Sequence, residues 1–424
     1  MDVQTMRREM QDVLNKNILP FWITKMADHY NGGFYGRVDG QGLLHLKAER
    51  GAILNARILW TFSAAYRVLG NQRYLDSAQR AKDYFIRHFI DQDYGGVYWI
   101  VDHKGKPLNT RKQFYAIAFA VYALTEYARA TGDREALDYA LQLFDCIEEH
   151  ALDPVDNGYI EATTRDWQPI ADMRLSELDA NAPKSQNTHL HILEAYTNLL
   201  RCLKEMQAAE SCDYVPVLGS ILPITISVPV ETLARVEGAL RNIVRLFTSK
   251  IINAHTHHLD LFFSMDWEHS AAHIESYGHD IECSWLLHEA VQVLADNELQ
   301  RKVEPIVQAM AQAARKGLAA DGSMLHEANI DTGAVDDNRL WWVQTETVVG
   351  YANIYQQYGD INAWQTACHC WEYIKNNLID YDSGEWYWSR DANGNINRTD
   401  DKAGFWKCPY HNSRMCIEII ERNF

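Results

Sequence analysis

The chain has 424 residues, of which 47% are hydrophobic and 23% are charged, a balance typical of a globular protein with a large core. Its formal net charge of −17 argues against nucleic acid and anionic membrane as partners, because both are polyanions that would repel it. Length alone suggests about three domains, but that rule is only a soft prior.

The N-terminal segment and the cysteines predict a cytoplasmic protein. Residues 1–9 lack the apolar core of a secretory signal and are typical of a polar helix start. The eight cysteines form no Cys-x-x-Cys pair and lie within helical patterns, as reduced thiols do when they serve as small apolar residues. An uncharged run at 214–230 is broken by prolines and is too short to span a bilayer. We interpret it as part of a loop insertion at about 206–234.

A glycine–aromatic turn recurs along the chain and reveals internal repeats. Gly33, Gly96 and Gly158 are 63 and 62 residues apart, and Gly322 and Gly384 are again 62 apart. The gap of 164 residues between Gly158 and Gly322 fits two periods plus the insertion. We therefore predict a sixth, glycine-free copy at 257–264.

Paired amphipathic segments lie between these turns. Segments 53–69, 115–130 and 345–358 keep apolar residues at helical spacing, end at a glycine followed by Asn or Asp, and are each followed by a second helix. Six helical hairpins that each bury an apolar face close most economically into a ring. We predict an all-α fold, a single (α/α)6 barrel over residues 1–424 with short β-hairpin turns. The alternative, an open superhelical stack, would need polar caps at both ends.

A polar or aromatic group of possible function occurs near the start of each predicted inner helix. Arg57 is notable because a buried guanidinium cannot lose its charge and needs an anionic partner or a ligand that becomes anionic. His279, Glu282 and Trp285 would share one helix face; the structural alternative is a core histidine satisfied by Glu282. The remaining candidates in chain order are Tyr115, Asn187, His191, Trp342, Glu346, Trp406 and His411.

Metal and serine-hydrolase chemistry fit this sequence poorly. The histidines at 255, 257 and 258 and at 189 and 191 diverge on a helix, and neither group has a carboxylate or cysteine at zinc spacing. The Gly-x-Ser-x-Gly pattern of a hydrolase elbow is missing. We therefore expect no metal site.

The candidate residues together favour a sugar ligand. The chain has 13 tryptophans and 22 tyrosines, whose faces can pack on sugar rings while polar groups bind the hydroxyls. Glycoside hydrolysis would need two carboxylates that flank the bond, and Glu282 and Glu346 are the candidates for that alternative. Epimerisation beside a carbonyl needs bases of near-neutral pKa and a cation for the enediolate oxygen. His279, His411 and Arg57 favour proton transfer, and a non-catalytic sugar-binding protein is a third possibility.

Four segments resemble the signature segments of the cellobiose 2-epimerases, in the N-acylglucosamine 2-epimerase superfamily of six-repeat α/α barrels. They are residues 56–60 (Ala-Arg-Ile-Leu-Trp), 276–282 (Ser-Tyr-Gly-His-Asp-Ile-Glu), 341–346 (Trp-Trp-Val-Gln-Thr-Glu) and 406–412 (Trp-Lys-Cys-Pro-Tyr-His-Asn). The resemblance extends from about residue 21 to residue 415.

The resemblance implies cofactor-free epimerisation at C2 of the reducing-end glucose of β-1,4-linked disaccharides such as cellobiose and lactose. It implies that His279 and His411 are the two acid/base residues and that Arg57 holds the oxygen that becomes negative. Further substrate contacts are implied for the other sites, with Glu282 and Glu346 either orienting histidines or assisting ring opening. The other sites are Tyr115, Asn187, His191, Trp342, Trp406 for stacking on the sugar, and Trp386 or Trp388 for the non-reducing unit.

Two points stay open in this interpretation. The insertion at 206–234 is longer than the superfamily usually shows, and it could be a lid, an interface or decoration; we favour one of the last two. The main rival function is an N-acylglucosamine 2-epimerase or a mannose-type aldose–ketose isomerase that uses the same enediol chemistry. We expect a small disaccharide as substrate, no nucleic acid or membrane partner, and a monomer or weak homodimer.

Overall fold

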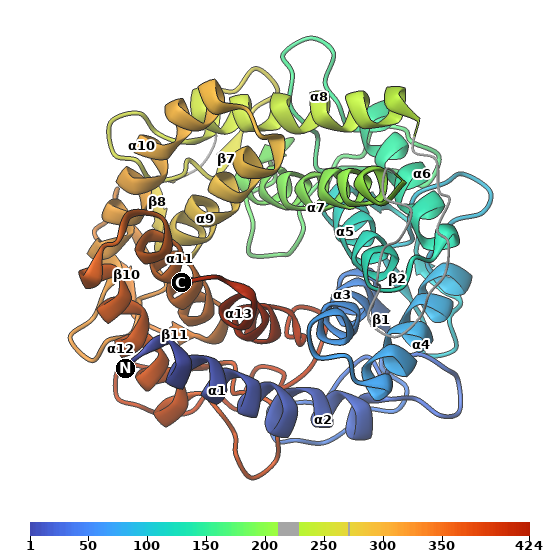
Figure 1. The fold of residues 1–424 in the computed structure, drawn as a ribbon. Helices are drawn as coiled ribbons and strands as arrows, with labels where there is room; N and C mark the ends of the chain where they lie inside the picture. The colour runs from blue at the N-terminus through green and yellow to red at the C-terminus, as the bar shows by residue number, and fades with distance from the viewer. Residues whose placement is uncertain (211–228, 270–271) are drawn as a thin grey trace.

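Six inner helices form a closed ring in the computed structural model, which describes residues 1–210, 229–269 and 272–424 (Figure 1). Each inner helix packs against the next, and α13 contacts both α11 and α3, which closes the circle. The predicted (α/α)6 barrel is confirmed. The inner helices are α3 (Ala52–Leu69), α5 (Phe114–Thr131), α7 (Gln186–Glu210), α9 (Tyr277–Leu294), α11 (Trp341–Tyr358) and α13 (Tyr410–Glu421).

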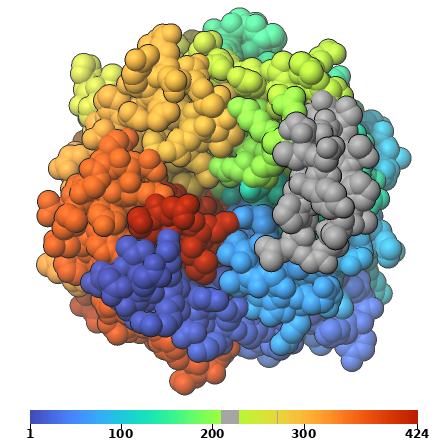
Figure 2. Space-filling view, viewed as in Figure 1, coloured from blue at the N-terminus to red at the C-terminus, as the bar shows by residue number. Residues whose placement is uncertain are grey.

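The outer helices surround this ring, and all of them except the three-residue α2 pack on an inner helix. The sixth pair is split between the two ends of the chain, because α1 packs against α13 and the two termini lie side by side (Figure 2). The outer layer consists of α1 (Val3–Val13), α2 (Leu19–Phe21), α4 (Gln72–His88), α6 (Arg134–His150), α8 (Val230–Leu246), α10 (Asn297–Ala314) and α12 (Ile361–Asn377), with π-helical turns at Leu14–Ile18, Trp22–Met26 and Phe247–Ile251 and a 3-10 turn at Arg315–Gly317.

Short turns connect each inner helix to its outer partner. Gly70, Gly132 and Gly359 end α3, α5 and α11 in the left-handed conformation, which glycine adopts without steric cost. The next residue is an asparagine or aspartate whose side chain caps the outer helix, as Asp360 does for α12. The paired stop and start signals of the sequence therefore define these hairpins.

Longer loops lead from each outer helix to the next inner helix, and short antiparallel strands join neighbouring loops. An additional bridge between Val38 and Ala403 links the first loop to the last, so the loops are joined around the barrel mouth. The strands are β1 (Arg50–Gly51), β2 (Ile100–Val101), β3 (Pro107–Asn109), β4 (Lys112–Gln113), β5 (Ala162–Thr163), β6 (Lys184–Ser185), β7 (Phe262–Phe263), β8 (Ile274–Ser276), β9 (Glu327–Asn329), β10 (Val335–Asp336), β11 (Arg339–Leu340) and β12 (Ser389–Arg390), in the orders β1-β2-β3, β10-β9-β8, β4-β5, β6-β7 and β11-β12.

The repeated turn occurs in all six loops, although the fifth copy is one residue shorter than the others. An antiparallel bridge closes each turn, and the Ile252–Leu259 bridge occupies the position predicted for the glycine-free copy. His257 has φ of 61° there, in the left-handed region that Gly32, Gly95 and Gly384 adopt at the corresponding position of other copies. The sixth repeat was therefore placed correctly.

Four of these loops contain a buried ion pair that fixes the loop against the barrel. An aspartate near the start of the loop binds a basic residue near its end, in the pairs Asp28–Arg50, Asp91–Lys112, Asp153–Lys184 and Asp380–Lys402. Each pair joins the start of its loop to the end of the same loop, and so stabilises the loops at the barrel mouth.

Replacing Lys184 with methionine should lower the free energy of unfolding by about 3–5 kcal/mol, because Asp153 would keep a buried charge without its cation. Lys184 Nζ lies 2.8 Å from Asp153 Oδ2, and neither side chain is more than 4% exposed. Urea unfolding measures the change. The matched control is Lys302→Met in the exposed Lys302–Glu298 pair, which should cost about 0–1 kcal/mol. Equal losses in the two variants would contradict the prediction.

The described ends of the predicted insertion are Glu210, at the end of α7, and Val230, at the start of α8. Because α7 begins at the barrel mouth, these ends lie at the opposite side of the barrel. The insertion's residues 211–228 lie outside the described part of the chain, so its role stays a prediction. No helix in the described ranges is long and apolar enough to cross a membrane.

Candidate functional site

A cavity of about 250 Å³ opens where the inner helices begin. All the predicted site residues line it except Glu346 and Trp386. Its lining consists of Arg57, Tyr115, Leu175, Ser176, Leu178, Asp179, Asn187, His191, His279, Glu282, Trp341, Trp342, Trp388, Trp406 and His411. The sequence-based expectation that each inner helix directs a functional group to the same end agrees with this geometry.

Trp386 is the predicted site residue that the structure places elsewhere. Its side chain is completely buried in the sixth turn, where its backbone bridges Ile379. Residues two apart share one side of a regular extended segment, but the backbone bends at Trp388, so Trp386 stays in the core while Trp388 lines the cavity. Of the two tryptophans proposed for the second sugar unit, only Trp388 is in position.

A second cavity of about 410 Å³ adjoins the first and shares lining residues with it, including Asn187 and His279. One wall of both cavities is the irregular loop between β5 and β6, which supplies Leu175, Ser176 and Asp179. The sequence analysis missed these residues, because the loop carries neither a motif nor a helical period.

Arg57 lies in the cavity wall as a buried cation without a carboxylate partner among the described residues. Its Nη2 donates to the Tyr115 hydroxyl at 2.8 Å, and its Nη1 lies 3.8 Å from Cys408 Sγ. Its guanidinium also stacks 4.2 Å from the ring centroid of Phe119. Because arginine keeps its charge in proteins, this side offers a fixed positive group for a negative oxygen of a ligand.

His279 and His411 lie on either side of Trp342, at ring-centroid distances of 4.7 and 5.8 Å. They come from α9 and α13, which are separated in the ring by α11. Burial lowers the pKa of His279 to about 3 and lowers the pKa of His411 well below its usual value. Both imidazoles are therefore neutral near pH 7 and can act as bases.

The neighbours of each histidine orient its ring. The Ser276 hydroxyl lies 2.8 Å from His279 Nδ1, and Glu346 Oε1 lies 2.8 Å from His411 Nδ1. Among the residues that the structure describes, Nε2 of neither ring has a hydrogen-bond partner. Glu282 does not pair with His279, so the alternative of a core histidine satisfied by that carboxylate is wrong.

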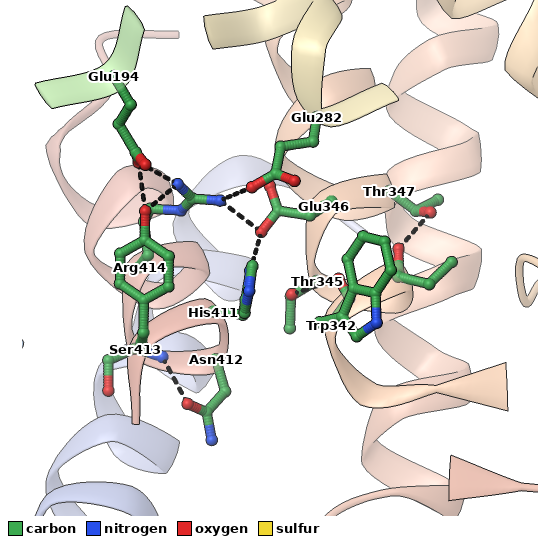
Figure 3. Close-up of polar contacts among 12 residues, drawn as sticks. Glu194, Glu282, Trp342, Thr345, Glu346, Thr347, His411, Asn412, Ser413 and Arg414 are labelled. Atoms are coloured by element: carbon green, nitrogen blue, oxygen red, sulfur yellow. Dashed lines mark hydrogen bonds and ion pairs between the residues drawn. The ribbon is translucent and has the colours of Figure 1, made fainter. Parts of the chain in front are cut away.

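Behind the cavity, one guanidinium joins three inner helices (Figure 3). Arg414 on α13 donates from Nη2 to Glu282 Oε1 at 2.6 Å and to Glu346 Oε1 at 2.7 Å, and its Nη1 binds Glu194. Glu194 also accepts from the Tyr410 hydroxyl and is 2.9 Å from His191 Nδ1. Trp285, which was predicted to share a helix face with His279, is 1% exposed. Its Nε1 donates a hydrogen bond of 3.1 Å to Glu346 Oε2.

The three carboxyl groups titrate differently. Burial would raise the pKa of Glu194, but Arg414 and the hydrogen bond with His191 lower it to about 2. Burial raises the pKa of Glu282 to about 8, and the neighbouring charge of Glu346 adds to this effect. Burial also raises the pKa of Glu346, although Arg414 opposes it. The cluster therefore retains a proton at neutral pH.

Sequence analysis missed Glu194, Tyr410 and Arg414, although helical spacing held a signal. Glu194 follows His191 by three residues, and Arg414 follows His411 by three, as Glu282 follows His279. Positions three apart are neighbours on a helix face, so each of these histidines has a charged residue beside it, one helical turn farther from the barrel mouth.

The candidate for a metal site in the described part of the chain is formed by Glu282, Glu346 and His411, whose ligand atoms lie within 4.8 Å of one another. Arg414 already donates to both carboxylates and places a positive charge there, which opposes a divalent cation. The other histidine groups hold loops: His189 Nε2 accepts from Tyr159 N at 2.9 Å, and His258 Nδ1 lies 2.6 Å from Asp280 Oδ2. We do not place a metal at any of these positions.

The chain is similar to known proteins along nearly its whole length. The family model described as N-acylglucosamine 2-epimerase (GlcNAc 2-epimerase) matches residues 33–207 and 235–414. The chain is 53% identical over 417 residues to the cellobiose 2-epimerase of Bacteroides fragilis, covering 98% of this chain and 99% of that protein. It is 38% identical over 415 residues to the cellobiose 2-epimerase of Ruminococcus albus, covering 98% of each chain.

A solved structure has the same architecture. The cellobiose 2-epimerase from Bacillus thermoamylovorans B4167 superposes with a TM-score of 0.88 at 40% sequence identity, covering 99% of this chain and 100% of that chain. The likeness therefore extends over the whole barrel.

Proposed function

Because the chain belongs to the N-acylglucosamine 2-epimerase family, we propose that it is a disaccharide epimerase. It inverts C2 of the reducing-end glucose of β-1,4-linked disaccharides such as cellobiose and lactose and leaves mannose at that position. The cellobiose 2-epimerases that it resembles over almost their full length support this substrate class. The observation that carries the reaction type is that two neutral histidines line the same cavity as Arg57, which has no carboxylate partner among the described residues.

The two histidines suit inversion by two bases. After the sugar ring opens, one neutral imidazole removes the C2 proton, and the electron pair moves to O1 through a planar cis-enediolate. The other imidazole, once protonated, returns a proton to the opposite face of C2. A single base would require the intermediate to turn over within the cavity. His279 and His411 come from helices on two sides of α11, so a sugar between them presents both faces.

Arg57 supplies the charge that the intermediate needs. The enediolate carries a negative oxygen, and a preorganised cation in a buried site stabilises such an oxygen more strongly than water does. Tyr115 fixes the guanidinium by its hydrogen bond of 2.8 Å, while Asn187 and His191 border the same cavity and can bind hydroxyl groups. We assign these residues to the reacting sugar.

The second cavity provides room for the non-reducing sugar unit. The two adjoining volumes of about 250 and 410 Å³ together fall within the range of about 300–1,000 Å³ typical of small-molecule sites. Trp388 and Trp406 border the first cavity and can pack on sugar faces, while Ser176 and Asp179 border both. This favours a disaccharide over the monosaccharide substrates of the rival epimerase and isomerase readings.

The geometry disfavours a glycosidase. Glu282 and Glu346 share one guanidinium nitrogen of Arg414, and Glu346 is completely buried and does not line the cavity. A hydrolase needs two carboxyl groups on opposite sides of the scissile bond, about 5–9.5 Å apart. This pair cannot enclose a glycosidic bond.

Incubation with cellobiose in deuterated water, without added metal or nucleotide, should yield glucosyl-mannose with deuterium at C2. Solvent exchange at C2 is expected because imidazole bases exchange their proton with water between turnovers. A proton NMR time course measures both the new signals and the lost C2 proton. Unchanged cellobiose would redirect the assignment to a monosaccharide substrate, and released glucose without exchange would contradict proton transfer altogether.

We further propose a cytoplasmic protein that works as a monomer or weak homodimer. The described cysteines are unbridged and most are buried, which suits a reducing compartment. The lining residues of the cavity named above all come from one chain, which is compatible with a monomer.

A further inference from the structure

Three carboxyl groups and one guanidinium meet behind the cavity, and this imbalance bears on the protonation of the resting enzyme. Glu194, Glu282 and Glu346 are each at most 2% exposed, and all three bind Arg414. One cation cannot stabilise three buried anions, because each uncompensated charge carries a large desolvation cost. The neighbouring imidazoles are neutral and supply no further charge.

Hydrogen bonds decide which carboxyl groups are ionised. Glu346 accepts from Arg414 Nη2 and Trp285 Nε1, and its third partner is His411 Nδ1. Glu194 accepts from Arg414 Nη1 and the Tyr410 hydroxyl and has His191 Nδ1 as its third partner. A carboxyl group surrounded by donors is best satisfied as an acceptor-only carboxylate. Both histidines then donate from Nδ1.

Glu282 differs from the other two. Among the described residues its hydrogen-bond partner is Arg414 Nη2, and its side chain borders the cavity. The groups that face it are Glu194 from α7, Glu346 from α11, Tyr115 from α5, and Tyr410, His411 and Arg414 from α13. The carboxyl with the fewest donors, beside two carboxylates, is the one that keeps a proton.

Resting on the proposed function, we infer that Glu282 is a neutral carboxylic acid in the resting enzyme and donates its proton to the ring oxygen when the sugar opens. Glu346 and Arg414 are positioning residues: they hold His411 with Nε2 free. This separates the roles of two glutamates that helical spacing alone could not distinguish.

The ring-opening step balances. A neutral histidine removes the proton of the anomeric hydroxyl, and that O–H electron pair forms the C1 carbonyl. The bond between C1 and the ring oxygen breaks, its electrons remain on that oxygen, and Glu282 supplies the proton. Ring closure of the product reverses these transfers and reprotonates Glu282, so no other reactant is consumed.

The pH dependence of turnover tests this assignment. Wild-type kcat should fall as pH rises through about 8, since the acid form of Glu282 is lost there. Glu282→Gln keeps a neutral side chain of the same size but cannot transfer a proton, so kcat should fall about 100-fold or more. Its residual rate should show no such alkaline fall, while Glu282→Asp should restore it. An alkaline fall that persists in Glu282→Gln would overturn the inference.

Infrared spectroscopy of the free enzyme provides a test that needs no activity. The band of a buried protonated carboxyl group should lose intensity in Glu282→Gln and should keep it in Glu346→Gln. If the band lost intensity only in Glu346→Gln, the proton would belong to Glu346 and not to Glu282, and the proposal would be refuted. If Glu282→Gln does not fold, the Glu346→Gln spectrum decides by itself. The result also stands apart from whether cellobiose is the substrate.

Glu418 offers a matched control at the other end of the barrel. It is a half-buried glutamate on α13, with a side chain that is 20% exposed, and burial raises its pKa to about 7; it pairs with Arg422 and does not line the cavity of the two histidines. Glu418→Gln should lose its own infrared intensity but keep the wild-type pH profile of turnover. If kcat of Glu418→Gln no longer fell at alkaline pH, the pH dependence would come from Glu418 and not from Glu282.

Discussion

Replacing His411 with asparagine should lower the turnover of cellobiose by about 10²–10⁴-fold, the usual contribution of a positioned acid/base group. The melting temperature should change little, because His411 is a cavity-wall residue on an otherwise intact helix α13. His279→Asn should have the same effect from the other side of Trp342. Steady-state kinetics of the two variants measure the loss of turnover, and thermal unfolding measures the change in melting temperature. Unfolding of His411→Asn would instead assign the histidine a structural role.

Two bases predict a further signature in these variants. With one histidine removed, the other should still exchange the C2 proton of one epimer with solvent, without converting it to the other epimer. The two variants should therefore exchange different substrates when cellobiose and glucosyl-mannose are each supplied in deuterated water. Exchange on both epimers by a single variant would contradict the two-base arrangement.

His189 is the matched control for both variants. It is a completely buried histidine on α7, but its Nε2 accepts from the backbone of Tyr159 and it does not line the cavity. His189→Asn should lower stability and leave kcat near the wild-type value. Loss of turnover with unchanged stability would show that burial of any inner-helix histidine, and not its position, determines activity.

Most of the fold could be predicted from the sequence because its signals are local and repeated. The turns centred near Gly33, Gly96 and Gly158 recur at a nearly constant interval, and glycine followed by Asn or Asp marks the end of one helix and the start of the next. These signals depend on backbone conformation at a few positions, so they survive without knowledge of tertiary contacts. The glycine-free copy near Leu259 was found by the interval alone.

The charged cluster could not be predicted in the same way. Arg414 and Glu194 lie 220 residues apart, and their contact exists only because α13 closes the ring between α11 and α3, opposite α7, so that the two side chains meet across the inside of the ring. The Trp386 error has a different cause. Both Trp386 and Trp388 looked suitable as aromatic platforms, because residues two apart share one side of a regular strand. The backbone bends at Trp388, however, and of the two only Trp388 lines the cavity.

Replacing Arg57 with methionine should lower kcat by about 10²–10³-fold or more, because the enediolate oxygen would lose its cation. The same change should leave stability equal or higher. Arg57 is 3% exposed and has no carboxylate partner in the described part of the chain, so its burial carries a desolvation cost that no ion pair offsets. The substitution should therefore lower kcat without lowering the free energy of unfolding. Kinetics on cellobiose and urea unfolding of the same preparation test both parts.

Arg414→Met provides the contrast, because that residue is equally buried but binds Glu194, Glu282 and Glu346. Its loss would leave buried carboxyl groups without their cation and should lower the free energy of unfolding by about 3–5 kcal/mol. Arg57→Lys keeps the positive charge and should recover part of the lost kcat. If Arg57→Met instead lowered the free energy of unfolding as much as Arg414→Met, Arg57 would have a structural role in the barrel. Its proposed role, to stabilise the negative oxygen of the intermediate, would then be contradicted.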